Sequence, residues 1–305
     1  MRVHKQVYKR IVAIVLVCIF AMSLFACGNK TNNNGAGSGD VIRVGSKNFT
    51  ENFILGEIFS LVLENAGFTV ERNFGLSSAV IHTAITSDEI DLYAEYTGTG
   101  LLAVLGLPLE TDPQKVYDTV KQQYLEQFNI VWLDYAQASN SQGLVVTRAI
   151  SEQLGITTIS DLQANAAQIR FASQGEFDHR DDGIPLLEKV YGPFAWASTR
   201  VIDNALKYEV LRNGEADAAP AYTTEGNLMS EDFVLLIDDK QAWPPYNIAP
   251  VIRKPVLDAH PEIADLLNAI MALLDNDTMI RLNARVDVDQ EEYQVVAQDF
   301  VNSLP

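Results

Sequence analysis

The residues best suited to binding chemistry lie at positions 91–100, which read Asp-Leu-Tyr-Ala-Glu-Tyr-Thr-Gly-Thr-Gly. An apolar strand is expected over residues 90–96, followed by a turn that offers hydroxyls and backbone N–H groups. Open α/β sheets bind their ligands at such carboxyl ends of strands. Two kinds of ligand fit these residues. One is a phosphate held by the glycines, and the other is a small zwitterion whose cationic end contacts tyrosine faces.

The elements that must position these residues begin after an N-terminal export signal. Basic side chains within residues 2–10 precede an apolar run over residues 11–26 that only Ser23 interrupts. This layout is typical of a signal peptide, because the run is too short and wrongly flanked for a transmembrane helix. An uncleaved N-terminal anchor is the alternative interpretation.

The segment Leu-Phe-Ala-Cys that ends at Cys27 resembles a bacterial lipobox, in which the cysteine is lipidated and becomes the first residue. We therefore expect residues 1–26 to be a lipoprotein signal peptide. Residues 27–40, rich in Asn, Gly and Ser, would be a flexible tether. The folded body would be lipid-anchored on the extracytoplasmic face of the cell membrane.

Cysteine and charge content exclude several classes of function. Cys18 lies in the signal and Cys27 would carry lipid, so the mature body has no thiol for a disulfide or a cysteine metal site. Removing residues 1–26, which carry four basic and no acidic side chains, lowers the formal charge from −18 to −22. Such acidity argues against nucleic-acid binding. The remaining histidines are too dispersed to suggest a metal site, so we expect no metal and no cofactor.

Two series of alternating strands and helices are expected in the remaining residues, about 265 in number. The alternation in the first series implies a parallel sheet, and prolines within residues 243–250 fix an extended return of the chain before a helical tail. This pattern predicts two lobes, the second inserted into the first. Lobe 1 would comprise residues 41–139 plus 248–305, and lobe 2 residues 140–247.

Two glutamates near the candidate residues are expected to be structural. Asn48 and Glu51 have the spacing of a capping box at the start of the first helix. Glu95 points away from its tyrosine neighbours, because side chains alternate along a strand. Glu95 is therefore predicted to be structural.

Five motifs together resemble the osmoprotectant-binding proteins of bacterial ABC importers, which bind glycine betaine, carnitine and choline. They are VGSKNFTE at 44–51, YAEYTGT at 93–99, DHRDDG at 178–183, AYTTEG at 221–226 and PPYNIAP at 244–250. The resemblance covers the chain from residue 41 to its end, and its specificity comes from the combination. It implies an α/β, two-lobe, type II periplasmic-binding-protein fold with a hinged ligand cleft.

The resemblance also implies a ligand site, transferred motif by motif. The aromatic box would comprise Tyr96, Tyr222, Tyr246 and, by a looser match, Tyr135; the groups for a ligand carboxylate would be Lys47, Thr99 and Arg180. A trimethylammonium group has no N–H, so aromatic faces hold it best, at about 0.5–2 kcal/mol each when desolvated. Arg and Lys suit a carboxylate, and the helix N-terminus after Lys47 also favours an anion.

These implications define an expected function. The protein would be a monomeric binding protein and no enzyme, and it would deliver a quaternary-ammonium osmolyte to the permease subunits of an ABC transporter. Ligand contacts from both lobes would favour a closed state, which the permease reads. The alternative is a ligand-sensing binding protein for another small zwitterion. Taken singly, the tyrosines could also be packing residues, and Arg180 could belong to an ion-pair cluster with its aspartate neighbours.

Two enzyme classes fit the sequence poorly. Gly98, Gly100 and Ala103 match the looser dinucleotide fingerprint G-x-G-x-x-A, which would make the protein an oxidoreductase. That fingerprint should open the first βαβ unit and be followed by an acidic residue at the end of the next strand, and here a helix is expected instead. The hydrolase motifs G-x-S-x-G and H-E-x-x-H do not occur.

Overall fold

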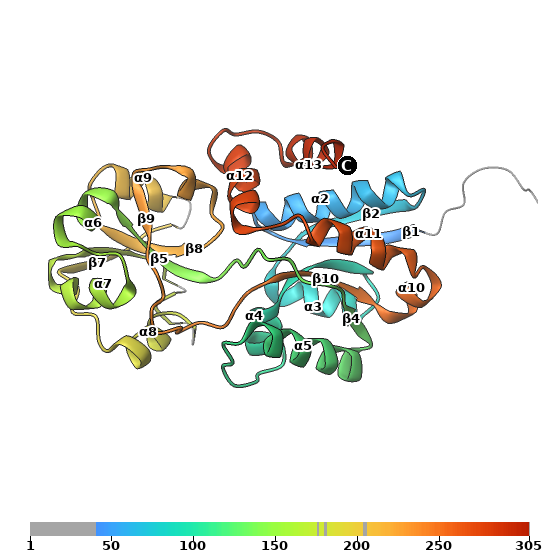
Figure 1. Ribbon diagram of the computed structural model, residues 1–305, viewed down its shortest axis with the longest axis horizontal. Coiled ribbons are helices and arrows are strands. Elements are labelled where there is room, and N and C mark those ends of the chain that lie inside the picture. The colour runs from blue at the N-terminus through green and yellow to red at the C-terminus, as the bar shows by residue number, and fades with distance from the viewer. Residues whose placement is uncertain (1–40, 176, 180–181, 204–205, 305) are drawn as a thin grey trace, which may run out of the picture. The chain divides into compact units, whose positions relative to one another are not determined.

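The computed structural model describes residues 41–175, 177–179, 182–203 and 206–304, all of which belong to one compact unit that spans residues 39–305. The predicted signal peptide, Cys27, the tether and Arg180 lie outside the described residues. Figure 1 shows two sheets, each with its own helices, joined by two extended segments.

The first sheet contains five strands in the order β2-β1-β3-β10-β4. They are β1 (Val41–Lys47), β2 (Thr69–Leu76), β3 (Leu92–Tyr96), β4 (Ile130–Trp132) and β10 (Ile248–Arg253). Strand β1 is parallel to β2 and β3, whereas β10 is antiparallel to β3 and β4. All residues of β3 are buried, as expected for a central strand that is covered on both faces.

The second sheet repeats this arrangement, with the order β7-β6-β8-β5-β9. Its strands are β5 (Gln142–Thr147), β6 (Arg170–Ser173), β7 (Ser198–Val201), β8 (Ala218–Tyr222) and β9 (Phe233–Leu235). Strand β6 is parallel to β7 and β8, and β5 is antiparallel to β8 and β9. Each strand therefore has a counterpart of equal position and direction in the first sheet. Strand β7 was not expected, because all its residues are exposed and it lacks a hydrophobic pattern.

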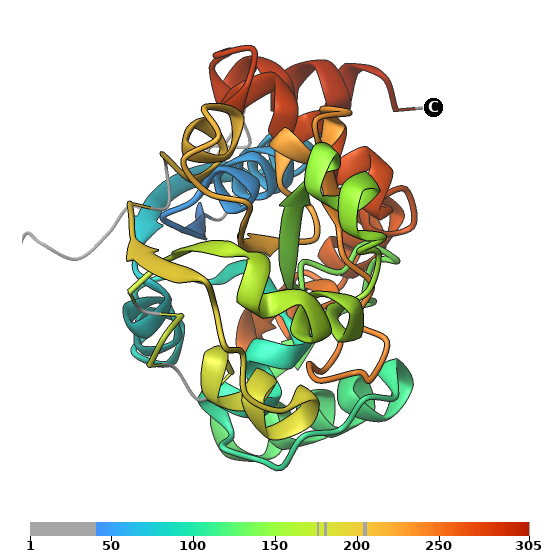
Figure 2. The ribbon, with the colours of Figure 1, turned by 90° about the vertical axis from the view of Figure 1, so that its left-hand side faces the viewer.

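Helices cover the faces of both sheets. The first sheet carries α2 (Thr50–Asn65), α3 (Ser78–Thr86) and α5 (Pro113–Phe128), and the short α4 (Thr97–Thr99) follows β3 directly. The second carries α6 (Arg148–Leu154), α7 (Ile159–Asn165), α8 (Ile184–Tyr191) and α9 (Lys207–Arg212). The chain ends in α10 (Lys254–Ala259), α11 (Glu262–Met271), α12 (Asn276–Asp287) and α13 (Tyr293–Asn302). Helices α11 to α13 pack on α2, as both views show (Figures 1 and 2).

The chain passes between the sheets twice, after β4 and again before β10. The two crossing segments pair with each other through an antiparallel bridge between Ser139 and Asn247. Helix α12 adds a further contact, because a Cβ on Gly226 would lie 2.5 Å from the backbone of Ala284. The first sheet is thus built from strands that come before and after, in the sequence, the segment that forms the second sheet. The assignment of residues 140–247 to a separately moving lobe remains a prediction.

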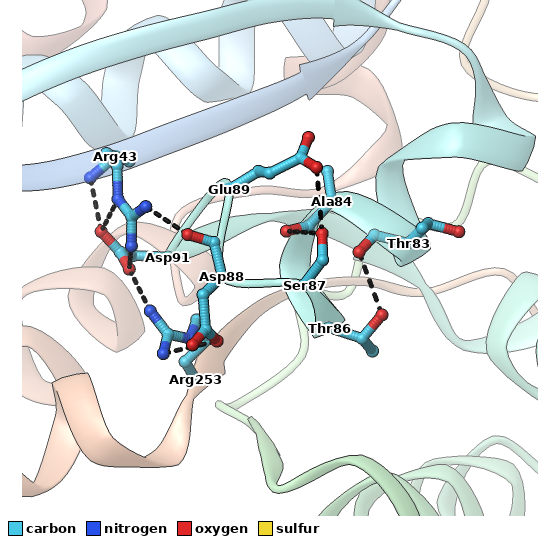
Figure 3. Close-up of polar contacts among 9 residues, drawn as sticks. All are labelled: Arg43, Thr83, Ala84, Thr86, Ser87, Asp88, Glu89, Asp91 and Arg253. Carbon is cyan, nitrogen blue, oxygen red and sulfur yellow. Dashed lines mark hydrogen bonds and ion pairs between the residues drawn. The ribbon is translucent and has the colours of Figure 1, made fainter.

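An Arg–Asp cluster fixes the start of β3, at the opposite end of the strand from Tyr96. The buried carboxylate of Asp91 accepts hydrogen bonds from the Arg43 backbone N at 2.9 Å, from Arg43 Nε at 3.0 Å and from Arg253 Nη1 at 2.9 Å (Figure 3). Burial alone would raise the pKa of Asp91, but the two arginines outweigh burial and lower it. The ionised carboxylate therefore stabilises the fold at neutral pH, and this contribution is lost as the pH falls through the lowered pKa.

The second sheet has the same cluster at the start of β8. Asp217 accepts hydrogen bonds from the Arg170 backbone N at 2.8 Å, from Nε at 2.9 Å and from Nη2 at 2.6 Å. Asp91 and Asp217 each stand five residues before a tyrosine of the predicted box, Tyr96 and Tyr222. The two clusters thus anchor the two strands that end in these tyrosines.

The two clusters should differ in their contribution to stability. Asp91 is bound by two arginines, whereas Asp217 has one, whose side chain is 46 % exposed. We expect Asp91→Asn to lower the free energy of unfolding by about 2–3 kcal/mol and Asp217→Asn by about 1–2 kcal/mol. Urea unfolding at pH 7 measures both values. Asp258→Asn, which breaks an exposed pair with Lys254, is the control and should cost less than about 0.5 kcal/mol. Equal losses in all three variants would contradict this account.

Candidate functional site

Two tyrosines of the predicted box end equivalent strands. Tyr96 is the last residue of β3 and pairs with Ile248, and Tyr222 is the last residue of β8 and pairs with Gln142. Gln142 is the first residue of β5, after the first crossing segment, and Ile248 is the first residue of β10, after the second. Both tyrosines therefore lie where the chain passes between the sheets.

Tyr246 lies in the second crossing segment and packs on the turn after Tyr96. A Cβ on Gly98 would be 2.8 Å from the Tyr246 ring and 2.9 Å from the Pro245 carbonyl oxygen. Thr97 Oγ1 donates to this carbonyl at 3.0 Å and accepts from the Asn247 backbone N at 3.0 Å. The lack of a side chain at Gly98 therefore makes room for an aromatic ring.

A loop of the second sheet reaches the same place. Asp182 Oδ2 lies 3.4 Å from the Tyr246 hydroxyl, which is a long contact, and 3.3 Å from Gln142 Nε2. Trp243 Nε1 donates to the Asp182 carbonyl oxygen at 2.6 Å. The loop that carries the DHRDDG motif thus joins the crossing segment, although Arg180 itself lies outside the described residues.

Lys47 Nζ lies over the Tyr96 ring, 4.9 Å from the ring centroid. Its side chain is 3 % exposed and forms an ion pair with Glu95. Glu95 also accepts hydrogen bonds from the Tyr93 hydroxyl at 2.9 Å and from the Tyr96 backbone N at 2.7 Å. The prediction that it points away from its tyrosine neighbours was therefore wrong for Tyr93, because residues two apart in a strand share a face. Contact between Lys47 and a ligand carboxylate stays a prediction.

A second buried lysine lies over the Tyr222 ring. Lys207 Nζ is 5.8 Å from the Tyr222 ring centroid and forms an ion pair with Glu225, which also accepts from the Tyr208 hydroxyl. Burial lowers the pKa of Lys207, and the neighbouring Glu225 opposes that shift. The sequence analysis missed this pair. The only available signal was the position of Glu225, three residues after Tyr222, whereas Lys207 comes from a different helix.

Two predicted site residues remain, Thr99 and Tyr135. Thr99 is half-buried in α4, and its hydroxyl makes no hydrogen bond to another described residue. Tyr135 lies 4.8 Å from the Tyr117 ring, centroid to centroid, and its hydroxyl contacts Gln114 of α5 at 3.3 Å. The described contacts of Tyr135 are thus with α5 and not with the other box tyrosines. Its role in binding stays a prediction.

Glu51 has a different role from the one expected. The residue before α2 is Phe49, no side chain caps this helix, and the Lys47 backbone N is bound by Asn52 at 2.6 Å. Glu51 is instead 2 % exposed and accepts a hydrogen bond from the Tyr96 hydroxyl at 2.9 Å. The capping prediction was wrong because tertiary partners, which come from distant segments, outcompete the local helix terminus.

Neither a metal centre nor a membrane span is found in the part of the chain that the structure describes. No group of three or more His, Cys, Asp or Glu side chains there could hold a metal ion. No helix among the described residues is long and apolar enough to cross a membrane.

Comparison with known proteins decides the family. The model for the substrate-binding domain of ABC-type glycine betaine transport systems, named OpuAC, matches residues 40–303. The chain belongs to the OpuAC family. This membership confirms the resemblance found in the sequence, and it places the chain among substrate-binding proteins of transport systems, which are not enzymes as a family.

Individual relatives agree with the family. A glycine-betaine-binding protein of Pseudomonas aeruginosa is 35 % identical and covers 93 % of this chain and 92 % of its own length. An ergothioneine transport permease and binding protein of Helicobacter pylori, EgtU, is 32 % identical over 86 % of this chain and 47 % of its own length. A solved structure described as a glycine betaine/carnitine/choline ABC transporter has a TM-score of 0.78 at 26 % identity and covers 86 % of this chain and 97 % of its own. The OpuAC-domain chain therefore has the expected type II periplasmic-binding-protein fold.

The contact between Gly98 and Tyr246 yields a test of the site's geometry. We expect Gly98→Ala to lower the free energy of unfolding by about 1–3 kcal/mol, because the new methyl group would overlap the ring and the carbonyl beside it. Urea unfolding gives the loss, and the NMR signals of the Tyr246 ring should shift. Gly175→Ala is the matched control, since its new Cβ would meet only Val201 at an ordinary 3.5 Å. Unchanged ring signals in Gly98→Ala would contradict the described packing.

Proposed function

We propose that this OpuAC-family protein is an extracytoplasmic solute-binding protein that captures a quaternary-ammonium osmolyte and delivers it to an ABC transporter. The candidate ligands are glycine betaine, carnitine, related betaines and choline. The observation that carries the proposal is that Tyr96 and Tyr222 end equivalent strands beside the crossing segments, and that Tyr246, in one of these segments, packs on the turn after Tyr96. The names of the relatives support the same ligand class.

The aromatic box suits the cation because a trimethylammonium group has no N–H to donate. Dispersion and the negative faces of aromatic rings hold such a group, at about 0.5–2 kcal/mol for each desolvated ring. Tyr96 comes from the first sheet, Tyr222 from the second and Tyr246 from the segment between them. Tyr135 is the fourth proposed member.

The carboxylate of a betaine would be bound by Lys47, Thr99 and Arg180. An ammonium group has three N–H donors, and Glu95 needs only one of those on Lys47. Donors therefore remain for a ligand, and the Thr99 hydroxyl is a further donor. Arg180 would add a bidentate contact that a carboxylate matches well.

Binding would favour closure of the two lobes, residues 41–139 plus 248–305 and residues 140–247. A ligand that touches groups from both sheets has more contacts in the closed state, so it shifts the equilibrium toward that state. The closed monomer would be the form that the permease subunits recognise. Neither a cofactor nor a catalytic step has a place in this proposal. A sensory partner in place of a permease is the alternative, and a transport assay separates the two.

Ergothioneine is a second candidate ligand. The relative from Helicobacter pylori is named for it, and ergothioneine likewise carries both a trimethylammonium group and a carboxylate. Ergothioneine also contains a ring, which glycine betaine lacks, so it would need more space beside the box. A direct comparison of the two ligands belongs in any binding study of this chain.

The N-terminal segment would anchor the protein. We propose that residues 1–26 are removed, that Cys27 is lipidated and that residues 27–40 tether the body to the extracytoplasmic face of the membrane. Acyl chains on Cys27 would insert into the bilayer.

We expect Cys27→Ser to move the protein from the membrane fraction to the soluble fraction on cell fractionation. Cys18→Ser, which lies within the signal, is the control and should leave the protein in the membrane fraction. If Cys27→Ser stays membrane-bound, an uncleaved N-terminal anchor is the better explanation.

Calorimetry on residues 40–305 tests the ligand class. We expect binding of at least one ligand among glycine betaine, carnitine, proline betaine, choline and ergothioneine, and none of an ordinary amino acid or a sugar. Tyr222→Ala and Tyr246→Ala should each weaken binding about tenfold, because each removes one face of the box.

The control for these tyrosine variants is Tyr293→Ala, which deletes a ring that stacks on Phe53 at 5.3 Å and is no member of the proposed box. It should keep the affinity of the parent protein. Binding of a sugar or an ordinary amino acid alone would refute the proposed function, and unchanged affinity in both box variants would refute the box.

A further inference from the structure

Glu51 differs from every other buried carboxylate that the structure describes. Five acidic residues are buried in the described part of the chain. Four of them form ion pairs with Lys or Arg: Glu57 with Arg72, Asp91 with Arg43 and Arg253, Glu95 with Lys47, and Asp217 with Arg170. No basic side chain among the described residues pairs with Glu51, so its charge lacks a partner within that part of the protein.

The contacts of Glu51 favour its ionised form nevertheless. Oε1 accepts hydrogen bonds from the Tyr96 hydroxyl at 2.9 Å and from Asn140 Nδ2 at 2.9 Å, and Oε2 accepts from Asn283 Nδ2 at 3.0 Å. All three groups are donors, which a carboxylate satisfies better than a carboxylic acid does. Burial is the larger effect and raises the pKa of Glu51, although the hydrogen bonds oppose that shift, so a cation nearby would favour the ionised carboxylate.

The position of the Glu51 carboxylate indicates which positive charge could pair with it. A buried charge without a partner is costly, and proteins normally pair it. Glu51 contacts the hydroxyl of Tyr96, whose ring is one wall of the proposed box. Asn52 Nδ2 lies 3.4 Å from the same hydroxyl, so the hydroxyl proton is free to point at Glu51. A phenol that donates to a carboxylate is polarised, and its ring face becomes more negative.

We propose that Glu51 supplies the negative charge of the quaternary-ammonium site through Tyr96, and that the bound cation is its charge partner. This inference rests on the proposed function and extends it. Glu51 is a positioning residue in this account, because it touches Tyr96 and not the ligand. It also sets selectivity, since a buried negative charge favours a net cation over a zwitterion whose own carboxylate it repels.

A purely structural role for Glu51 makes a different prediction. Asn140 lies in the first crossing segment, and Asn283 of α12 also donates to the Thr224 carbonyl at 2.7 Å, two residues after Tyr222. The carboxylate could simply hold these segments together. In that case its removal would weaken the binding of all ligands by the same factor, whatever their charge.

Glu51→Gln separates the two roles. Gln has the size of Glu but no charge, and its amide can donate to Asn140 Oδ1, which is buried without a hydrogen-bond partner in the described protein. We expect the dissociation constant for choline to rise about tenfold and that for glycine betaine about threefold or less, both measured by calorimetry at pH 7. The ratio of the two constants is the decisive readout.

Asn283→Ala is the matched control, because it removes a hydrogen bond from the same carboxylate but leaves the charge in place. It should change both dissociation constants by the same factor. Equal factors for the two ligands in Glu51→Gln, or no change in either, would overturn the inference while leaving the proposed function intact. Failure of the parent protein to bind either ligand would overturn both.

Tyr96→Phe provides a second route if Glu51→Gln does not fold. This variant keeps the aromatic ring but removes the hydroxyl through which Glu51 would act on it, whereas the amides of Asn140 and Asn283 still bind the carboxylate. The affinity for choline should then fall more than that for glycine betaine, in the same direction as in Glu51→Gln. An equal fall for the two ligands in this variant would also overturn the inference.

Discussion

The pairing of the two crossing segments is the interaction on which the rest of the structure depends. The bridge between Ser139 and Asn247 is reinforced because Ser139 Oγ accepts a hydrogen bond from the Tyr246 backbone N at 3.0 Å and the Tyr246 carbonyl accepts from the Asn140 backbone N at 3.0 Å. Thr223 Oγ1 donates to the Ser139 carbonyl at 2.6 Å and so ties the end of β8 to the same point. This joint holds the ends of β3 and β8, and with them Tyr96 and Tyr222, beside the crossing segments.

Most of the buried charges near the two crossing segments are paired. A buried lysine lies over the ring of each of the two strand-end tyrosines, and a glutamate forms an ion pair with each lysine. Each Lys–Glu pair therefore adds little net charge beside its tyrosine. Glu51 is the exception, with a carboxylate that no described base balances. A site of this kind would prefer a ligand that brings its own positive charge.

Much of this architecture could be predicted from the sequence, because its signals are local. The alternation of strands and helices indicated two α/β series, and the glycine and threonine after Tyr96 marked a strand end. The similarity of the two sheets could not be predicted, since no repeat of fixed period is visible and only the five-residue spacings from Asp91 to Tyr96 and from Asp217 to Tyr222 reflect it. Partners that are far apart in sequence were likewise invisible, including those of Glu51 at positions 96, 140 and 283. The capping-box prediction for Glu51 was wrong for the same reason, because its actual partners are far away in the sequence.

The central claim is that three tyrosines from different parts of the chain surround one trimethylammonium group. Isotope-filtered NMR on protein with labelled tyrosine rings, saturated with glycine betaine or choline, tests it most directly. The account predicts nuclear Overhauser effects from the ligand's methyl protons to the rings of Tyr96, Tyr222 and Tyr246 within one complex. Effects to other aromatic rings alone, or to none of these three in a saturated complex, would contradict it.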